Sequence, residues 1–253
     1  MRNGTRWPVC IVVALTAALL LCSVTTSGAG LRLDIESGYV GSGYNDVRIP
    51  GDTGTDISLN DDLSTDAAPY FRARVEYDLG ERHTVSALYA PLTLSADGTL
   101  AGPVDFAGVT YPGGTDVDGT YTFNSYRLTY RYALVRGDRF SAGIGFTGKI
   151  RDAVIRLEGG GLSSEKTDVG FVPLLNFKLV WTASDRVDLL LEGDALAAPQ
   201  GRAEDVIAGA VFHATDNLDV RVGYRIVEGG ADNDEVYTFA LLNYASVGLV
   251  ATF

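Results

Sequence analysis

The chain has 253 residues, of which 46% are hydrophobic, 10% aromatic and 21% charged, and its net charge is −12 at pH 7. Such an acidic chain is not expected to bind nucleic acid, which associates with basic surfaces. Its two cysteines, Cys10 and Cys22, both lie near the N-terminus. The rest of the chain therefore offers no disulfide, thiol nucleophile or cysteine metal site.

Residues 1–29 have the pattern of a secretory signal peptide. Arg2 and Arg6 precede an apolar run from about Val9 to Leu21, and small residues follow up to Ala29. The run is shorter than the roughly 18 apolar residues that a membrane-spanning helix needs. The sequence therefore predicts export, with cleavage after Ala29, and a mature domain of residues 30–253. Without the two arginines the net charge falls from −12 to −14.

From residue 31 onward the alternation of apolar and polar residues is that of β-strands, and no helical periodicity recurs. In Tyr70–Leu79 every second residue from Phe71 is apolar, and the residues between are Arg72, Arg74, Glu76 and Asp78. Ten segments are predicted as strands: 31–41, 69–79, 84–95, 120–134, 139–155, 169–182, 187–197, 203–214, 218–228 and 236–253.

The connections between these segments alternate in length. Four are tight polar turns, at 79–82, 136–139, 183–186 and 215–217, and between them lie longer excursions at 42–68, 96–119, 156–168, 198–202 and 229–235. An up-and-down meander would place all the tight turns at one end, as in bacterial outer-membrane proteins. We predict an all-β, antiparallel transmembrane barrel of about ten strands, with short periplasmic turns and longer extracellular loops. A soluble sandwich or a lipocalin-like barrel is the alternative.

Aromatic residues on the apolar faces are sorted by position along the strands. Those near a tight turn or the chain end are predicted to form one interfacial girdle: Tyr77, Tyr132, Phe140, Trp181, Phe212 and Phe253. A second girdle near the long loops would contain Tyr39, Phe71, Phe171 and Tyr237.

In such a barrel the apolar faces meet lipid and the charged faces line the lumen. The predicted lumen charges are Arg72, Arg74, Glu76, Asp78, Arg127, Arg131, Lys149, Lys178, Asp188, Glu192, Asp194, Arg221 and Arg225. Ten strands leave little more room than side chains fill. Because both signs occur, we expect pairing across strands, for example between Lys178 and Glu192, and a plugged or very narrow lumen.

The C-terminal strand carries a family resemblance. Val247, Leu249 and Ala251 alternate up to the terminal Phe253. This resembles the signal by which outer-membrane β-barrel proteins are handed to the barrel assembly machinery, although that family more often has an aromatic residue where Ala251 stands. The resemblance implies outer-membrane insertion and a transient assembly partner. It implies no substrate.

No catalytic, cofactor or strong metal motif stands out. The two histidines, His83 and His213, are both predicted at the periplasmic rim. The stretch "FHATD" around His213 resembles the His/Asp pair of omptin proteases, but it lies at the wrong end of the barrel. The stretch "ADNDE" could offer oxygen ligands to a divalent cation, yet it lacks the spacing of an EF-hand loop. The outer connections are expected to be solvated, with charges that include Arg151, Arg202, Asp205 and Glu228.

These patterns together favour an outer-membrane barrel with a structural or surface-binding role and no enzymatic activity. Its expected partners are outer-membrane lipids and lipopolysaccharide, with divalent cations at the acidic loops as a further candidate. A small-solute channel is the first alternative. An enzyme acting on outer-leaflet lipid is the second, and it is disfavoured because no histidine or cysteine is predicted at the external end.

Overall fold

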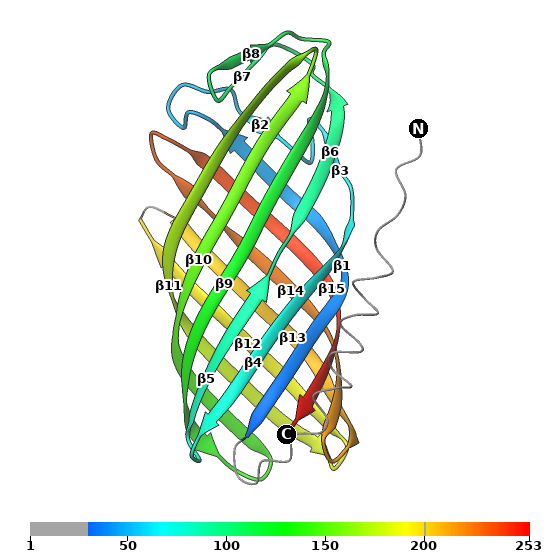
Figure 1. Ribbon diagram of the computed structural model, residues 1–253, viewed down its shortest axis with the longest axis vertical. Helices are drawn as coiled ribbons and strands as arrows, with labels where there is room; N and C mark the ends of the chain where they lie inside the picture. The colour runs from blue at the N-terminus through cyan, green and yellow to red at the C-terminus, as the bar shows by residue number, and fades with distance from the viewer. Residues whose placement is uncertain (1–29, 200) are drawn as a thin grey trace.

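The computed structural model describes residues 30–199 and 201–253, and these residues form strands, turns and loops. Within this part, no helix is long and apolar enough to cross a membrane. Ten of the described strands form a closed antiparallel barrel (Figure 1). They are β1 (Leu31–Arg48), β4 (Ala68–Leu79), β5 (His83–Ala90), β9 (Asp116–Arg136), β10 (Phe140–Gly159), β11 (Leu162–Ser184), β12 (Val187–Ala198), β13 (Gly201–Thr215), β14 (Leu218–Asp232) and β15 (Tyr237–Thr252). The predicted fold class is confirmed; the predicted signal peptide lies outside the described residues.

The barrel is closed by its first and last strands. β15 pairs with β1 from Thr252 opposite Arg32 to Tyr237 opposite Arg48, and β1 pairs on its other side with β4. A closed sheet leaves no free edge and pairs its backbone groups internally, which a membrane-spanning sheet requires. The C-terminus lies at the end of the barrel that carries the tight turns (Figure 1).

The two ends of the barrel differ in their connections. Four short turns join β4 to β5, β9 to β10, β11 to β12 and β13 to β14, as predicted. At the opposite end, Gly160 and Gly161 alone join β10 to β11, with φ of 59° and 80°. Two successive residues with positive φ form the type I′ turn that suits a two-residue hairpin. The excursions predicted at 156–168 and 198–202 are therefore mostly extensions of the strands.

The sequence did not predict the strand extensions because the apolar residues change from the outward to the inward face along long strands such as β9. In the part of β9 near the tight turns, Leu128 faces outward and is 63% exposed, whereas Arg127 faces the lumen and is 5% exposed. Toward the other end, Asp118 is exposed and Val117 is buried. The lower part of the barrel thus has an inverted pattern, and the upper part has the pattern of a water-soluble sheet.

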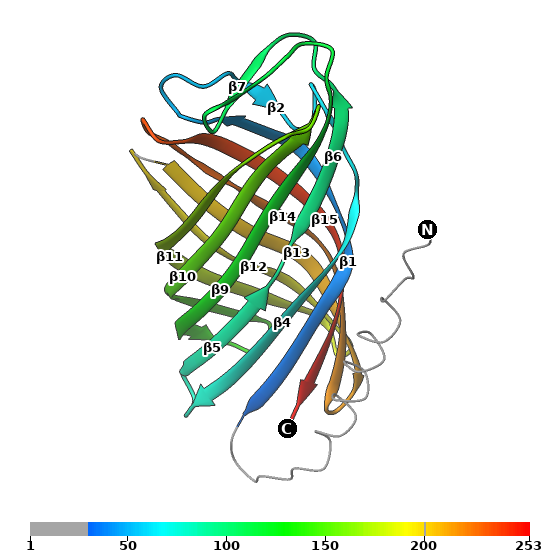
Figure 2. The same cartoon turned by 45° about the horizontal axis from the view of Figure 1, so that its top comes forward.

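A cap covers part of the upper end. It consists of residues 49–67 with β2 (Ile57–Ser58) and β3 (Ser64–Thr65), and the hairpin of β7 (Val104–Phe106) and β8 (Val109–Tyr111), which follows β6 (Thr93–Thr99). Figure 2 shows these segments over the barrel mouth. The Tyr111 hydroxyl donates to the Leu157 carbonyl at 2.6 Å and fixes the hairpin to β10.

Beneath the cap lies a hydrophobic core that the sequence reasoning did not anticipate. Cap and upper barrel contribute to it jointly, with Leu59, Phe106 and Tyr111 from the cap and Leu157 and Leu242 from the wall, each no more than 2% exposed. The loops predicted here as solvated therefore bury apolar side chains between their exposed aspartates.

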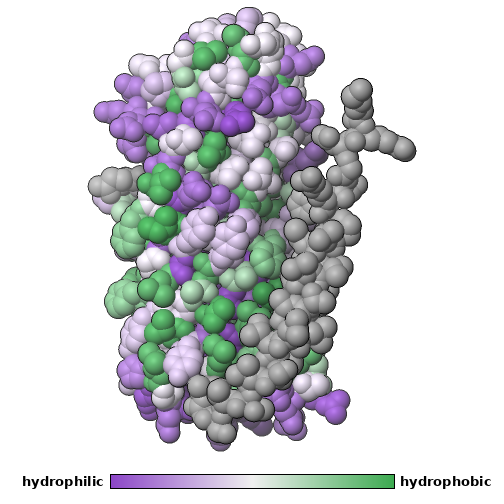
Figure 3. All heavy atoms as spheres, viewed as in Figure 1, coloured by the Kyte–Doolittle hydropathy of each residue, from purple (hydrophilic) through white to green (hydrophobic). Residues whose placement is uncertain are grey.

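Outside, apolar side chains gather over the middle of the visible face and hydrophilic ones mostly at its two ends (Figure 3). Of the turn-side aromatics, Tyr77, Phe140, Trp181 and Phe212 are between 42% and 53% exposed, while Tyr132 and Phe253 are half-buried. At the other end, Tyr39 and Phe171 are 64% and 66% exposed, and Phe71 and Tyr237 are half-buried.

Candidate functional site

The lower lumen is filled by ion pairs that cross it. Asp205 of β13 sits at the centre, where its carboxylate accepts hydrogen bonds from Arg72 at 2.8 Å and from Arg225, and forms an ion pair with Arg127 at 2.6 Å. These arginines come from β4, β9 and β14. All four side chains are between 3% and 6% exposed. We call the set of paired lumen charges the ionic layer.

Two acids of β1 extend the ionic layer on one side. Glu36 binds Arg225 through both of its oxygens, at 2.7 and 2.9 Å, and accepts from Arg221 at 2.8 Å. Arg221 also donates to both oxygens of Asp34, at 2.7 and 2.9 Å. Bidentate contacts of this kind fix the guanidinium plane as well as its position.

A second group lies nearer the tight turns. Glu192 pairs with Arg74, with Arg131 at 3.4 Å and with Lys178 at 3.5 Å. Glu76 accepts hydrogen bonds from Arg131 at 3.1 Å and from Arg32 at 3.2 Å. Arg32 also pairs with Asp78, at 2.6 Å. The expected pair of Lys178 and Glu192 therefore exists, but Arg74 and Arg131 share the carboxylate with Lys178.

Asp194 is the last acid of the ionic layer, and it is bound by neutral side chains as well as by an arginine. It accepts from Arg127 at 2.8 Å, from Thr147 at 2.6 Å and from the Asn176 amide at 2.8 Å. Thr147 in turn lies 2.7 Å from the Thr129 hydroxyl. Buried charges are tolerated where they are both paired and hydrogen-bonded, and these contacts meet that requirement.

Four residues of the ionic layer were not among the predicted lumen charges: Arg32, Asp34 and Glu36 on β1, and Asp205. The placement of Asp205 in a solvated connection was wrong, because β13 already begins at Gly201 and Asp205 is 3% exposed. The alternation of Arg32, Asp34 and Glu36 in β1 carried the signal that could have identified its three charges.

Asp188 lies apart from the ionic layer, at the turn-side mouth. His213 stands between Asp188 at 3.3 Å and Asp219 at 2.8 Å. His83 is exposed, and its Nδ1 lies 2.7 Å from the Tyr130 hydroxyl. Both histidines are thus at the end of the barrel opposite the cap, where the sequence predicted them.

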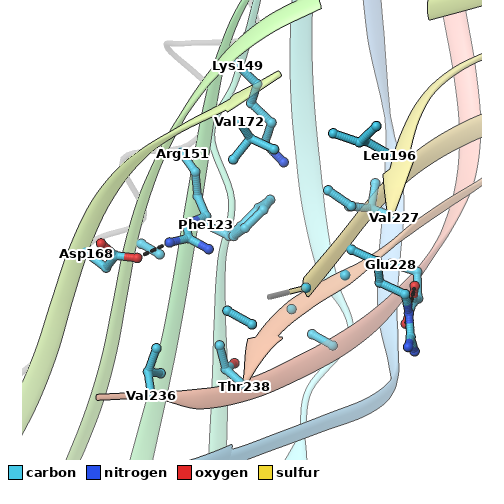
Figure 4. Close-up of a pocket in the computed structure, with 18 of the residues that line it drawn as sticks. Phe123, Lys149, Arg151, Asp168, Val172, Leu196, Val227, Glu228, Val236 and Thr238 are labelled. Atoms are coloured by element: carbon cyan, nitrogen blue, oxygen red, sulfur yellow. Dashed lines mark hydrogen bonds and ion pairs between the residues drawn. The ribbon is translucent and has the colours of Figure 1, made fainter. Parts of the chain in front are cut away.

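Lys149 is the predicted lumen charge that enters no ion pair with the described residues. It is 4% exposed, and its Nζ lies 4.5 Å from the centre of the Phe123 ring. Two residues further along β10, Arg151 pairs with Asp168 but leaves its buried Nε without a hydrogen-bond partner in the described part of the chain. Figure 4 shows both cations directed into one space.

That space is a cavity of about 430 Å³ above the ionic layer. The walls are mainly apolar, with Ile155, Leu196, Val227, Ala240 and Leu242 among the lining residues. None of the ionic-layer residues lines it. The cavity has the size and character of a small-molecule site, which is typically about 300–1,000 Å³ and mostly apolar with a few polar groups.

The cavity also reaches the outside of the barrel wall. β11 pairs with β12 only from Leu175 opposite Ala195 toward the tight turn, so among the described residues the flank of residues 162–174 has no strand partner on that side. Pro173, which has no N–H to donate, stands where the pairing ends. It lines the cavity together with the exposed Phe171. We call this gap the side opening.

A metal centre is not evident in residues 30–199 and 201–253, where no group of three or more His, Cys, Asp or Glu side chains is placed to hold an ion. In the "ADNDE" stretch, Asn233 Oδ1 accepts from the backbone N–H groups of Glu235 and Val236, both at 3.0 Å. The stretch therefore forms a local turn between β14 and β15.

The sequence matches no family model and no curated protein. Among solved structures, the outer membrane protease OmpT from Escherichia coli superposes with a TM-score of 0.53 at 12% identity, over 91% of this chain and 99% of OmpT. The translocator domain of the autotransporter NalP from Neisseria meningitidis gives 0.46 at 12% identity, over 97% and 96%. The attachment invasion locus protein Ail of Yersinia pestis gives 0.40 at 12%, over 88% and 99%. The likeness to OmpT is one of fold, and a shared barrel fold assigns no activity.

Proposed function

Starting from this outer-membrane β-barrel fold, we propose that the protein is an integral outer-membrane barrel with a closed lumen that binds a ligand at its capped end, and that it is neither a channel nor an enzyme. The observation that carries the proposal is the ionic layer. Its charges come from strands on opposite sides of the barrel and meet within hydrogen-bond distance, with Asp205 held by three arginines. A water-filled pore would leave such charges solvated and apart.

A binding role is supported by the position of the cavity. It lies at the capped end, above the ionic layer, and it combines apolar walls with a buried lysine that has no carboxylate partner in the part of the chain that the structure describes. The histidines, which would be the natural acid–base groups, lie at the other end of the barrel. As an integral outer-membrane barrel, the protein is also expected to be recognised by the barrel assembly machinery through its terminal Phe253 and to contact lipopolysaccharide.

Single-channel recording in a planar bilayer tests the closed lumen. The purified, folded protein is expected to give no conductance steps under conditions in which a porin control conducts. Steady steps whose reversal potential shifts with a salt gradient would overturn the proposal and favour the small-solute channel.

Epitope tags test the orientation. A tag at Asp61, in the cap, is expected to be labelled on intact cells, whereas a tag at Gly137, in a tight turn, should be labelled only after the outer membrane is permeabilised. Labelling at Gly137 alone would place the cavity on the periplasmic side.

A further inference from the structure

We propose that the cavity binds a single-chain amphiphile with an anionic headgroup, a carboxylate or a phosphate, which reaches it from the outer leaflet through the side opening. This inference rests on the proposed function, because it names the ligand class of the binding site. The headgroup sits on Lys149 and the Nε of Arg151, and the hydrocarbon chain lies against the apolar walls.

The charge of the ligand follows from the pairing of the cations and acids that line the cavity. Arg151 pairs with Asp168, Arg202 with Glu228 at 2.6 Å, and Lys166 with Glu235 at 3.4 Å. Lys149 is the remaining charged lining residue, and among the described residues it has an aromatic ring beside it and no carboxylate partner. A buried ammonium without a counter-ion is unfavourable. An anionic group bound there would relieve that cost.

The apolar part of the ligand follows from the wall opposite the cations. Leu196 of β12 and Val227 of β14 lie across the cavity from Lys149 (Figure 4), and Leu242 of β15 also lines it. Val227 and Leu242 belong to the hydrophobic core beneath the cap. A hydrocarbon chain placed on this surface would remove further apolar area from water, which is favourable in proportion to the area buried.

The route follows from the register of β11. Val172 lies opposite Lys149 in the β10–β11 ladder, three residues beyond the last β11–β12 pair at Leu175, so the cation stands beside the part of β11 that is not paired to β12. Phe171 is 66% exposed on the outer face at this level, where interfacial aromatics are found in barrels. An amphiphile in the outer leaflet therefore has its headgroup at the height of the side opening, beside the lysine.

Native mass spectrometry of the folded full-length barrel in neutral maltoside micelles tests the inference, with oleate, oleoyl lysophosphatidate and methyl oleate as probes. One equivalent of an anionic probe is expected to bind to each barrel. Methyl oleate should bind at least about tenfold more weakly, because a hydrogen bond between charged groups strengthens binding by about tenfold or more. The preference between the two anions identifies the headgroup as carboxylate or phosphate.

Two substitutions and one control locate the site. Lys149→Met keeps an unbranched side chain that is one atom shorter and removes its charge, so oleate binding should weaken about tenfold to a hundredfold. Leu196→Trp keeps the lysine and fills the cavity, and it should abolish binding. Lys178→Met removes a lysine of the ionic layer that does not line the cavity, and oleate binding should be unchanged.

Heat-modifiable gel migration of each variant shows that the barrel is folded, which separates lost binding from lost structure. Equal binding of oleate and methyl oleate, or an equal effect of Lys149→Met and Lys178→Met, would overturn the inference. Conductance recorded on the same preparation bears on the closed lumen alone, so the two proposals can fail separately.

Discussion

The lower and upper halves of the barrel interior are built from the same strands but filled in opposite ways. β9 supplies Arg127 and Arg131 to the ionic layer and, further along, Val117 and Tyr121 to the hydrophobic core. The two halves differ in the character of the outer face of the barrel. Where the outer face is apolar and suited to lipid, the inside holds the charges; where the outer face is charged, the inside is a conventional core. The medium outside therefore determines which residues the interior can hold.

The largest effect is expected from breaking the ionic layer. Arg225→Met removes a buried cation that Glu36 and Asp205 share, and it should lower the free energy of unfolding by about 3–5 kcal/mol, because both buried carboxylates lose a charge-assisted hydrogen bond at once although each keeps other arginines. Unfolding in urea, followed by gel migration, measures it. Arg136→Met, which breaks the exposed pair with Glu81, is the matched control and should cost less than about 1 kcal/mol. Equal losses would mean that the lumen charges are solvated.

The hydrophobic core should respond locally. Leu59→Ala removes a side chain that is 2% exposed and should destabilise the cap by about 2–5 kcal/mol, while the barrel below remains folded. Hydrogen exchange of residues 49–67 should accelerate with no change in gel migration. Asp61→Ala, at an exposed position of the same segment, should change neither. A simultaneous loss of the barrel would show that the two halves form one cooperative unit.

An arginine introduced on the outer face of β9 should be tolerated differently in the lower and upper halves of the barrel. Leu128→Arg should cost up to about 2–4 kcal/mol, because the charge would face hydrocarbon. Asp118→Arg, on the same face of the same strand above the change of phase, should cost nothing measurable. Leu128→Ala controls for the lost side chain. Similar tolerance of arginine at both positions would contradict the assignment of the lower outer face to lipid.

The smallest effect is expected at Lys178. Its side chain is 29% exposed, and Glu192 retains Arg74 and Arg131 when Lys178 is removed. Lys178→Met should therefore change the free energy of unfolding by less than about 1 kcal/mol, whereas Glu192→Gln, which removes one carboxylate partner from three cations at once, should cost several times more. A double-mutant cycle measures the coupling. A loss for Lys178→Met as large as that for Glu192→Gln would show that the two act as an isolated pair.

The location of the ionic layer also changes which control is suitable for the lipid face. The inward-facing Thr129 would be a natural neutral site, and the sequence indicates that Thr129→Asn should be mild. In the structure its hydroxyl lies 2.7 Å from Thr147, which donates to Asp194. Substitution there disturbs the ionic layer, so Leu128→Ala is the better comparison.

The fold could be predicted from the sequence because alternation, tight turns and strand number are local or countable features. The identity of lumen partners could not, because Asp205 and Arg72 are brought together only when the barrel closes. The strand extensions were hidden for another reason. Val154, Arg156 and Glu158 continue the outward face of β10, but charged residues on the outward face predict a loop if the lipid-facing pattern continues along the whole strand. The cavity depends on the residue at which the pairing of β11 with β12 ends, and the alternation of apolar and polar residues does not predict that point.

The unpaired flank of β11 also limits how the barrel sits in its bilayer. Backbone groups without partners cannot lie in hydrocarbon, so residues 162–174 must stand in headgroups or water. Below them, Leu175–Ser184 is paired on the β12 side, and these ten residues match the roughly 9–11 that a tilted strand needs to cross. The crossing segment of this strand is thus no longer than it has to be. A thicker bilayer would bring acyl chains against bare backbone, and the protein should accordingly favour thin membranes, as the bacterial outer membrane is.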